Sequence, residues 1–452
     1  MRICHVAPEL LPVPPTKGGA IERWIRDAAV RLAARGHELH VISRDHGDGA
    51  ATLDQDGVRY HFLPMPSRLD QGLAAAMARG LWYYTRVRQL VATLAPDIVH
   101  HHSRPAGLWL SSGGAAKSII SLHSMDYGWG FGHRAWDRPF FPRGLRAAAK
   151  VLCVSDFIRR HTIERYPFVA AKCATVYNGV DGRTFSPRLL RAVRDDALTV
   201  LYVGRVEQRK GVHVIVDAFE RVISPRVPTA RLTIVGPHSY WDNRPAPYYA
   251  ALAARCATNA RIELRGPTYD DRELAETYRS ADVAVVPSTF PEALGLTSLE
   301  AQASGVPVVV SDAGGLPETV SPGRSGFVFA NGSAEQLGEA VVDLLRSASR
   351  RREMALAARE WALATFSWDV IAAQLESVYL DVLKGTNSGL ASGVEPHPFK
   401  TSRPAGGGAK ERCSSEAEPN REFAVISGAA SLVLGAPAHG TAPLRQGYGG
   451  RA

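Results

Sequence analysis

Two successive series of short apolar runs, separated by helix-length segments, constrain the fold of this chain most strongly. The expected strands of the first series are Arg2–Ala7, Glu38–Ser43, Val58–Leu63, Asp97–His101, Ser118–His123, Val151–Ser155 and Ala174–Tyr177. Those of the second are Thr199–Val203, Arg231–Val235, Arg261–Leu264, Val283–Val286, Pro307–Val310 and Gly326–Phe329. Strands that alternate with helices are typical of parallel sheets covered on both faces. The pattern predicts an α/β protein with two Rossmann-like, doubly wound domains.

The seam between the two series lies near Asp181–Asp195, where Gly182, Pro187 and several arginines interrupt both periodicities. We therefore expect one Rossmann-like domain over residues 1–185 and a second over 186–367. Beyond Gly385 the character changes: residues 386–452 contain three consecutive glycines at 406–408 and little periodicity. We expect this tail to be disordered and to lie outside the catalytic body.

Composition excludes several classes of protein. Hydrophobic residues make up 45% and charged residues 21%, which is typical of soluble globular chains, and the formal charge is +9. No apolar stretch reaches the ~18 residues of a membrane span, and the N-terminus does not read as a signal peptide. We expect a cytoplasmic protein, with peripheral contact at the inner face of the membrane left open. The five cysteines are scattered without a C-x-x-C pair, which indicates buried apolar thiols and no metal or redox site.

Cations follow the first strand of the second series. The segment Gly204–Gly211 carries Arg205 and Lys210 directly after Thr199–Val203, at the sheet edge where open α/β folds bind ligands. A guanidinium fork and a compact ammonium suit a diphosphate. A Walker A loop is excluded because Arg209 and Gly211 flank the lysine. A solvated basic turn is the alternative.

A pair of carboxylates follows a later strand of the same series. Glu292 and Glu300 come after Val283–Val286, eight positions apart, with Gly295 between them. This spacing predicts Glu292 on a loop and Glu300 about one turn into a helix, beside free backbone amides. Amides bind phosphate or sugar oxygens, and carboxylates accept hydrogen bonds from hydroxyls. A ligand with a diphosphate and sugar hydroxyls fits both segments; two unrelated surface carboxylates are the alternative.

Several further motifs occur in a recognisable order. They are Lys17-Gly18-Gly19, Arg35-Gly36-His37-Glu38, Asn178-Gly179-Val180-Asp181 and, after the two segments above, Asp312-Ala313-Gly314-Gly315-Leu316-Pro317-Glu318. Over about residues 1–385 the sequence resembles the retaining glycosyltransferases of family 4, and its start is most similar to bacterial members, including spore-coat glycosyltransferases. The resemblance implies the GT-B fold, in which an acceptor domain and a donor domain face each other across a cleft. It also implies that a helix over 368–385 crosses back to the first domain.

The resemblance assigns roles to individual residues. Arg205 and Lys210 would hold the donor diphosphate, Glu300 the ribose hydroxyls and Glu292 the transferred sugar. His123, at the end of the expected strand Ser118–His123, would face the donor sugar; a ring that caps a strand-end carbonyl is the alternative. The implied catalytic set is His123, Arg205, Lys210 and Glu292. The implied donor-binding set is Gly18, Gly19, Gly204, Arg205, Lys210, Gly236, Arg265, Gly266, Glu292, Ala293, Leu294, Gly295, Leu296, Thr297 and Glu300.

No metal or cofactor is expected. Asp54-Gln55-Asp56 spells the D-x-D of the other large glycosyltransferase fold, but it precedes the strand Val58–Leu63, whereas a metal motif should follow a strand. We interpret it as a solvated turn. His100-His101-His102 also invites a metal interpretation, yet side chains alternate along a strand, so three consecutive histidines cannot converge.

The expected reaction is transfer of a hexose from a nucleotide diphosphate sugar, of the UDP-glucose or UDP-N-acetylglucosamine type, to a cell-surface glycan or lipid-linked acceptor. The segments Arg68–Leu90 and Tyr127–Arg146 mix arginines with aromatics, which suits lipid-linked acceptors or simple packing. No nucleic-acid partner is expected. The alternatives are a nucleotide-sugar epimerase and a catalytically inactive coat or binding component. The absence of G-x-G-x-x-G after either first strand argues against a dehydrogenase.

Overall fold

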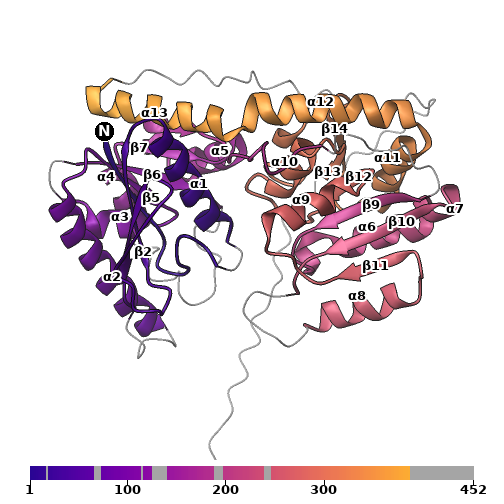
Figure 1. The fold of residues 1–452 in the computed structure, drawn as a ribbon, viewed down its shortest axis with the longest axis horizontal. Coiled ribbons are helices and arrows are strands. Elements are labelled where there is room, and N and C mark those ends of the chain that lie inside the picture. Colours follow the sequence, from indigo (N-terminus) through magenta and orange to yellow (C-terminus); the bar gives the residue numbers. More distant parts are fainter. Residues whose placement is uncertain are drawn as a thin grey trace, which may run out of the picture. The chain divides into compact units, whose positions relative to one another are not determined.

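The computed structural model describes residues 1–16, 19–65, 73–113, 116–124, 140–187, 197–238 and 246–386. These residues belong to one compact unit that contains two β-sheets flanked by helices (Figure 1). The two sheets confirm the predicted pair of Rossmann-like domains. Apart from residue 386, the expected disordered tail lies outside the described residues.

The first sheet has eight strands in the order β3-β4-β2-β1-β5-β6-β7-β8. They are β1 (Arg2–Val6), β2 (Glu38–Arg44), β3 (Thr52–Gln55), β4 (Val58–Leu63), β5 (Ile98–His102), β6 (Lys117–Leu122), β7 (Lys150–Cys153) and β8 (Cys173–Thr175). Its helices are α1 (Ala20–Ala34), α2 (Leu73–Leu94), α3 (Pro105–Ser111), α4 (Phe141–Ala147), α5 (Asp156–Arg165) and the 3₁₀ turn η1 (Pro167–Lys172). All neighbouring pairs are parallel except β3 with β4.

Strand β3 is not among the strands expected from the sequence. All four of its residues are exposed, so it lacks the apolar run by which the other strands were recognised. It pairs antiparallel with β4 at the edge of the sheet. Asp54 and Gln55 therefore belong to a strand, and only Asp56, with φ +52°, lies in the turn.

The second sheet has six parallel strands in the order β11-β10-β9-β12-β13-β14. They are β9 (Leu198–Val203), β10 (Ala230–Val235), β11 (Ile262–Arg265), β12 (Val283–Val286), β13 (Val308–Ser311) and β14 (Gly326–Phe329). Its helical elements are η2 (Gln208–Lys210), α6 (Val212–Ala218), η3 (Phe219–Ile223), α7 (Ser224–Arg226), α8 (Pro247–Ala257), α9 (Asp271–Arg279), α10 (Leu296–Ala303), η4 (Leu316–Thr319) and α11 (Ala334–Arg346). The strand order reverses between β9 and β12, and this is a doubly wound sheet.

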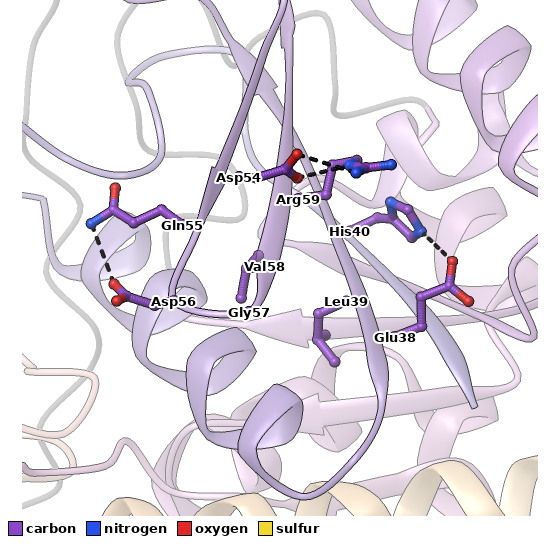
Figure 2. A pocket seen from close by; sticks show the side chains of 9 residues that line it. All are labelled: Glu38, Leu39, His40, Asp54, Gln55, Asp56, Gly57, Val58 and Arg59. Atoms are coloured by element: carbon purple, nitrogen blue, oxygen red, sulfur yellow. Dashed lines mark hydrogen bonds and ion pairs between the residues drawn. The ribbon is translucent and has the colours of Figure 1, made fainter.

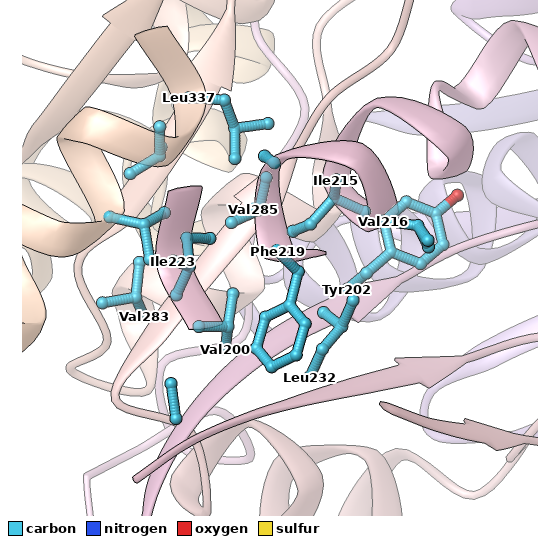
Figure 3. Close-up of a cluster of buried hydrophobic side chains, with 14 of the residues drawn as sticks. Val200, Tyr202, Ile215, Val216, Phe219, Ile223, Leu232, Val283, Val285 and Leu337 are labelled. Atoms are coloured by element: carbon cyan, nitrogen blue, oxygen red, sulfur yellow. The ribbon is translucent and has the colours of Figure 1, made fainter. Parts of the chain in front are cut away.

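Helices cover both faces of the second sheet, which explains why its central strands β12 and β13 are buried along their whole length, whereas the edge strand β11 has exposed charged residues. Figure 3 shows one side of this core, where Val200 of β9 and Val283 of β12 meet Phe219 and Ile223 of η3. Phe219 is fully buried. Burial of such a side chain stabilises the fold by about 1.5–3 kcal/mol relative to exposure.

The last two helices join different cores. Helix α12 (Ala348–Phe366) places Phe366 in a core of the second sheet, whereas α13 (Trp368–Lys384) places Trp368 and Leu375 in a core of the first sheet together with Trp24 of α1. Ser367 separates the helices, and its side chain accepts a hydrogen bond from the Val370 amide at the start of α13. The last helix thus returns to the first domain, as the resemblance implied.

The motif Asp312–Glu318 contributes a helix cap. Both carboxylate oxygens of Glu318 accept hydrogen bonds, each of 2.7 Å, from the amides of Asp156 and Phe157 at the start of α5. A carboxylate at this position also interacts favourably with the helix dipole. The second domain therefore stabilises a helix of the first.

Helix α2 turns two of its aromatic residues inward. Tyr83 and Tyr84 are buried, and their hydroxyls donate to the Ala7 carbonyl and to the Glu9 carboxylate. Both tyrosines therefore pack in the interior and are not available for contact with a lipid-linked acceptor. Residues 125–139, most of the second aromatic segment, lie outside the described residues. No helix in the described part of the chain is long and apolar enough to span a bilayer.

Five histidines lie at the centre of the first sheet. His5 of β1 and His100, His101 and His102 of β5 are buried, and His123 follows β6. Burial lowers the pKa of His5, His101 and His123 from the ordinary 6.5 to about 3 and lowers the pKa of His100 and His102 well below 6.5. The low-dielectric interior disfavours imidazolium, so these rings are neutral at pH 7.

We expect these rings to make the fold sensitive to acid. Below pH 6.5 the unfolded rings take up protons that the folded rings do not, so the free energy of unfolding falls as the pH drops toward 3. Each ring contributes about 1.4 kcal/mol per pH unit in this range. The free energy of unfolding, measured with urea from pH 7 to 5, should change less steeply with pH for His101→Gln than for the wild type. The difference in slope should correspond to about one proton taken up on unfolding. Equal slopes would contradict the assignment.

Candidate functional site

Two segments meet at the switch point of the second sheet. The turn after β9 and the loop after β12 both leave the carboxyl edge, where open α/β sheets bind ligands. Gly211, with φ +70°, lies between them, and a Cβ there would lie 1.8 Å from the carbonyl oxygen of Pro287. Only glycine combines this backbone conformation with so close an approach. The contact between the two segments therefore depends on this residue.

Lys210 and Glu292 face each other across this contact. The Nζ of Lys210, in η2, lies 2.5 Å from Oε1 of Glu292, and the Ser288 hydroxyl donates to the same oxygen over 2.5 Å. Their side chains are only 20% and 13% exposed, so solvent screens this pair less than a surface ion pair. The ammonium also lies 5.0 Å from the centre of the Phe290 ring. The structure thus brings together two residues that the sequence analysis had selected separately.

Arg205 lies in the same turn as Lys210. Its guanidinium is 2.6 Å from Oε1 of Glu207, and its backbone carbonyl accepts a hydrogen bond from the Tyr202 hydroxyl. The preceding Gly204 directly follows β9 and lies next to Gly236, which directly follows β10. A Cβ on Gly236 would lie 1.9 Å from the Gly204 carbonyl oxygen. The two strand ends are therefore in direct backbone contact beside the arginine.

The N-terminus of α10 lies in the same loop as Glu292. Gly295 is the N-cap, with φ +117° and no side-chain cap. The amides of Leu296 and Thr297, the first two of the helix, have no acceptor within the helix and lie at the positive end of its dipole, whereas the Ser298 amide donates to the Gly295 carbonyl. Leu296 and Thr297 are half-buried, whereas the Leu294 side chain is 1% exposed and belongs to the core. Ala293 and the start of α10 thus contribute through the backbone more than through large side chains.

Glu300 is buried within α10. It accepts a hydrogen bond of 3.0 Å from the Tyr278 hydroxyl, and the guanidinium of Arg23 in α1 lies 3.5 Å away. Burial raises the pKa of Glu300, while Arg23 and the Tyr278 hydroxyl act in the opposite direction. Asp271 also pairs with Arg23, at 3.0 Å. The carboxylate therefore sits in a polar cluster whose partners come from distant parts of the chain.

The remaining residues of the expected donor-binding set are more scattered. Arg265 ends β11, the edge strand, and its guanidinium pairs with Glu263 at 2.8 Å in an exposed position; Gly266 follows it. Gly19 is the N-cap of α1, with φ +142°. Gly18 lies outside the described residues.

The His123 ring is hydrogen-bonded to the ring of His102. Its Nε2 lies 3.0 Å from Nδ1 of His102, and the Trp24 ring is 5.2 Å away in an edge-on arrangement. The alternative interpretation, in which the ring caps a strand-end carbonyl, is therefore wrong for Nε2.

The three histidines of β5 divide between the two faces of the strand. His101 faces away from His100 and His102, as alternation predicts, but His100 and His102 converge with His5 of β1, with nitrogens within 4.8 Å of one another. His5 lies on the adjacent strand β1, so alternation along β5 alone does not predict this convergence.

The D-x-D sequence lies in a surface hollow lined also by Glu38 and His40 (Figure 2). Asp54 forms two hydrogen bonds, of 2.7 and 3.1 Å, with Arg59 on β4. The guanidinium lowers the pKa of Asp54. This carboxylate is therefore already paired across the β3–β4 hairpin.

Several residues that the sequence did not single out contact the expected site residues or the histidines of β5; they include Ser288, Tyr278, Arg23 and His5. Ser288 lies two residues after the end of β12 and four before Glu292, and this position could have identified it. Tyr278, Arg23 and His5 carry no such signal because their contacts cross between strands or helices distant in the chain.

Two family models match the chain. The model "Glycosyltransferase Family 4" matches residues 18–183, and "Glycosyl transferases group 1" matches residues 191–361. Among curated proteins, Spore coat protein SA of Bacillus subtilis is 28% identical over 84% of this chain and 99% of its own length. A GDP-mannose-dependent alpha-(1-6)-phosphatidylinositol monomannoside mannosyltransferase of Mycobacterium tuberculosis is 29% identical over 83% of this chain and 97% of its own.

A solved structure shares the fold. HepE of Anabaena, in complex with UDP and glucose, matches 84% of this chain and 99% of its own with a TM-score of 0.63 and 20% identity. The two sheets, the returning helix and the two family models agree. The chain belongs to the family 4, group 1 glycosyltransferases and has the GT-B fold.

Proposed function

We propose that this protein is a retaining, metal-independent glycosyltransferase that moves a hexose from a nucleotide diphosphate sugar to a glycan or lipid-linked acceptor. The observation that carries the proposal is the half-buried pair of Lys210 and Glu292 beside the uncapped N-terminus of α10. The family supports glycosyl transfer itself; the donor, the acceptor, the stereochemistry and the metal independence are the proposal.

The diphosphate would bind at the turn after β9. Lys210 pairs with Glu292, and a diphosphate brings more than one negative charge to compete for the ammonium. Arg205 offers a guanidinium fork from the same turn. The first amides of α10 offer hydrogen-bond donors. These groups would stabilise the charge that grows on the leaving diphosphate, the role for which other enzymes use a metal ion.

The carboxylates would select the sugar and the ribose. Once the diphosphate has taken the Lys210 ammonium, Glu292 could accept hydrogen bonds from hydroxyls of the transferred sugar. Glu300, held by Tyr278, would accept from the ribose hydroxyls, and His123 would face the sugar from the first domain. Gly18 and Gly19 would let their loop approach the diphosphate. Because HepE was crystallised with UDP and glucose, we favour a UDP-hexose over the GDP-mannose named for the mycobacterial relative.

Retention would follow from attack on the face that the diphosphate leaves. The acceptor oxygen forms a bond to the anomeric carbon as the bond from that carbon to the phosphate oxygen breaks. The acceptor proton passes to a phosphate oxygen of the departing diphosphate. The protein then contributes positioning and electrostatic stabilisation. We place the reaction in the cytoplasm, with peripheral membrane contact when the acceptor is lipid-linked.

A catalytically inactive coat component is the second candidate, because one relative is a spore coat protein. Arg205, Lys210, Glu292, Glu300 and His123 are all present, which favours turnover. A nucleotide-sugar epimerase would need no acceptor, and product analysis separates it from a transferase.

A donor screen tests the proposal directly. The purified chain should bind one UDP-sugar in preference to GDP-, ADP- and TDP-sugars and hydrolyse it slowly, with the same rate in EDTA. Ligand-detected NMR measures binding, and release of UDP measures turnover. Preference for GDP-mannose would overturn the choice of base, loss of turnover in EDTA would overturn metal independence, and binding without turnover with any acceptor would favour the inactive component.

Lys210 and the neighbouring Arg209 provide a test variant and a matched control. Lys210→Ala should lower turnover by about 10²–10³, as loss of one oxyanion donor does. Arg209→Ala is the control, since this neighbouring cation is half exposed and pairs with Glu207; its turnover should stay within about twofold, the range of an exposed ion pair. Rates are measured by release of the nucleotide. Equal losses in both variants would contradict a specific role for Lys210.

A further inference from the structure

Three histidine rings form a continuous hydrogen-bonded chain at the switch point of the first sheet. Nε2 of His123 lies 3.0 Å from Nδ1 of His102, and Nε2 of His102 lies 3.0 Å from Nδ1 of His5. At the inner end, Nε2 of His5 is buried and has no partner among the described residues. The chain of contacts thus runs from the interior of the sheet to the histidine that the proposed function places at the donor sugar.

Proton counting allows only two states of this chain. A neutral imidazole has one N–H and one acceptor nitrogen, and each contact needs one donor and one acceptor. If His102 carries its proton on Nδ1, it donates to His123, accepts from His5, and all three rings are Nδ1–H. If His102 carries the proton on Nε2, all three rings are Nε2–H. The tautomer of His123 is therefore coupled to that of His5.

The buried end decides between the two states. In the Nε2–H state His5 would hold a buried N–H without an acceptor, whereas in the Nδ1–H state it leaves only an unused lone pair. Buried N–H groups without partners are the rarer case. The Trp24 indole N–H, which can only donate, is also buried and has no partner in the described part of the chain, and its ring centre lies 6.3 Å from that of His5. A buried Nε2–H on His5 would add a second donor without an acceptor next to the Trp24 indole, and this would destabilise the folded state.

We propose that His5 and His102 lock His123 in the Nδ1–H tautomer, so that His123 presents a hydrogen-bond donor. His5 and His102 are then positioning residues. The depressed pKa values of His5 and His123, both about 3 because of burial, agree with neutral rings. The consequence for the reaction rests on the proposed function: Nδ1–H would hold an oxygen of the donor sugar, and the ring would not act as a base through this nitrogen.

A metal ion held by His5, His100 and His102 accounts for these contacts less well. His100 already uses both nitrogens, with the Tyr379 hydroxyl and the Ser121 hydroxyl each 2.7 Å away. His5 and His102 are bonded to each other. Ligation would break at least one of these hydrogen bonds, whereas the chain of three neutral rings uses them all.

Tautomers can be read directly in the full-length protein. Two-bond ¹H–¹⁵N spectra of the histidine-labelled chain at pH 7.5 distinguish Nδ1–H from Nε2–H rings. His5→Phe and His123→Gln assign the signals by their loss. We expect Nδ1–H for His5, His102 and His123, with spectra unchanged by EDTA or by ZnCl₂. An Nε2–H His123, an imidazolium, or shifts of the His5 and His102 signals with EDTA or ZnCl₂ would overturn the proposal.

A variant tests the coupling. His5→Phe keeps a ring but removes the donor, so His102 and His123 should show mixed tautomers, and turnover should fall by up to about tenfold, the effect of one hydrogen bond. His101→Gln is the matched control, because this buried histidine of the same strand faces the opposite side; its His123 tautomer and turnover should not change. An unchanged His123 tautomer in His5→Phe would overturn the coupling. If His5→Phe does not fold, the wild-type spectrum still decides the tautomer, and it does so whether or not any donor is turned over.

Discussion

The close contact between two turns at the carboxyl edge of the second sheet is the constraint on which the candidate site depends. Gly211 lies against the Pro287 carbonyl where no side chain would fit. This approach sets Lys210 at one end of η2 against Glu292, and Glu292 is in turn four residues ahead of the start of α10. A wider separation of the turns would leave a cation, a carboxylate and a helix N-terminus as three independent surface features. Together they form one half-buried polar site.

The two sheets use equivalent positions in chemically different ways. In the second sheet the switch point between β9 and β12 holds a charged pair that is partly open to solvent. In the first sheet the switch point between β1 and β5 holds neutral imidazoles in the interior. Burial explains the contrast, because a charge without a compensating partner is expelled from a low-dielectric core whereas neutral rings can satisfy one another. The proposed diphosphate would need a charged pair that it can displace, as in the second sheet, and the proposed tautomer of His123 would need neutral, hydrogen-bonded rings, as in the first.

Sequence patterns predicted those parts of the structure whose cause is local. The strands buried on both faces are continuous apolar runs, so they were recognised, while the exposed β3 has no such run and was missed. Lys210 and Glu292 were selected because each follows a strand, and parallel strands end at one edge. Tyr278 and His5 were missed because each acts through a contact between segments that are distant in the chain. Ser288 was missed although it lies in the same loop as Glu292, four residues before it. The aromatic residues of α2 show the same limit: composition allowed a surface role for Tyr83 and Tyr84, and packing buried both.

The sequence by itself determined the two doubly wound domains, the family and the main charged residues of the site, since periodicity and motif order are properties of the chain alone. Only the tertiary structure decided which of those residues meet. It brought Lys210 into an ion pair with Glu292 and the Tyr278 hydroxyl into a hydrogen bond with the buried Glu300. It also connected His123 to His5 by hydrogen bonds through His102. The reason is physical: a hydrogen bond or ion pair depends on distances of about 3 Å, and strand register and helix packing, which arise from the whole fold, set those distances.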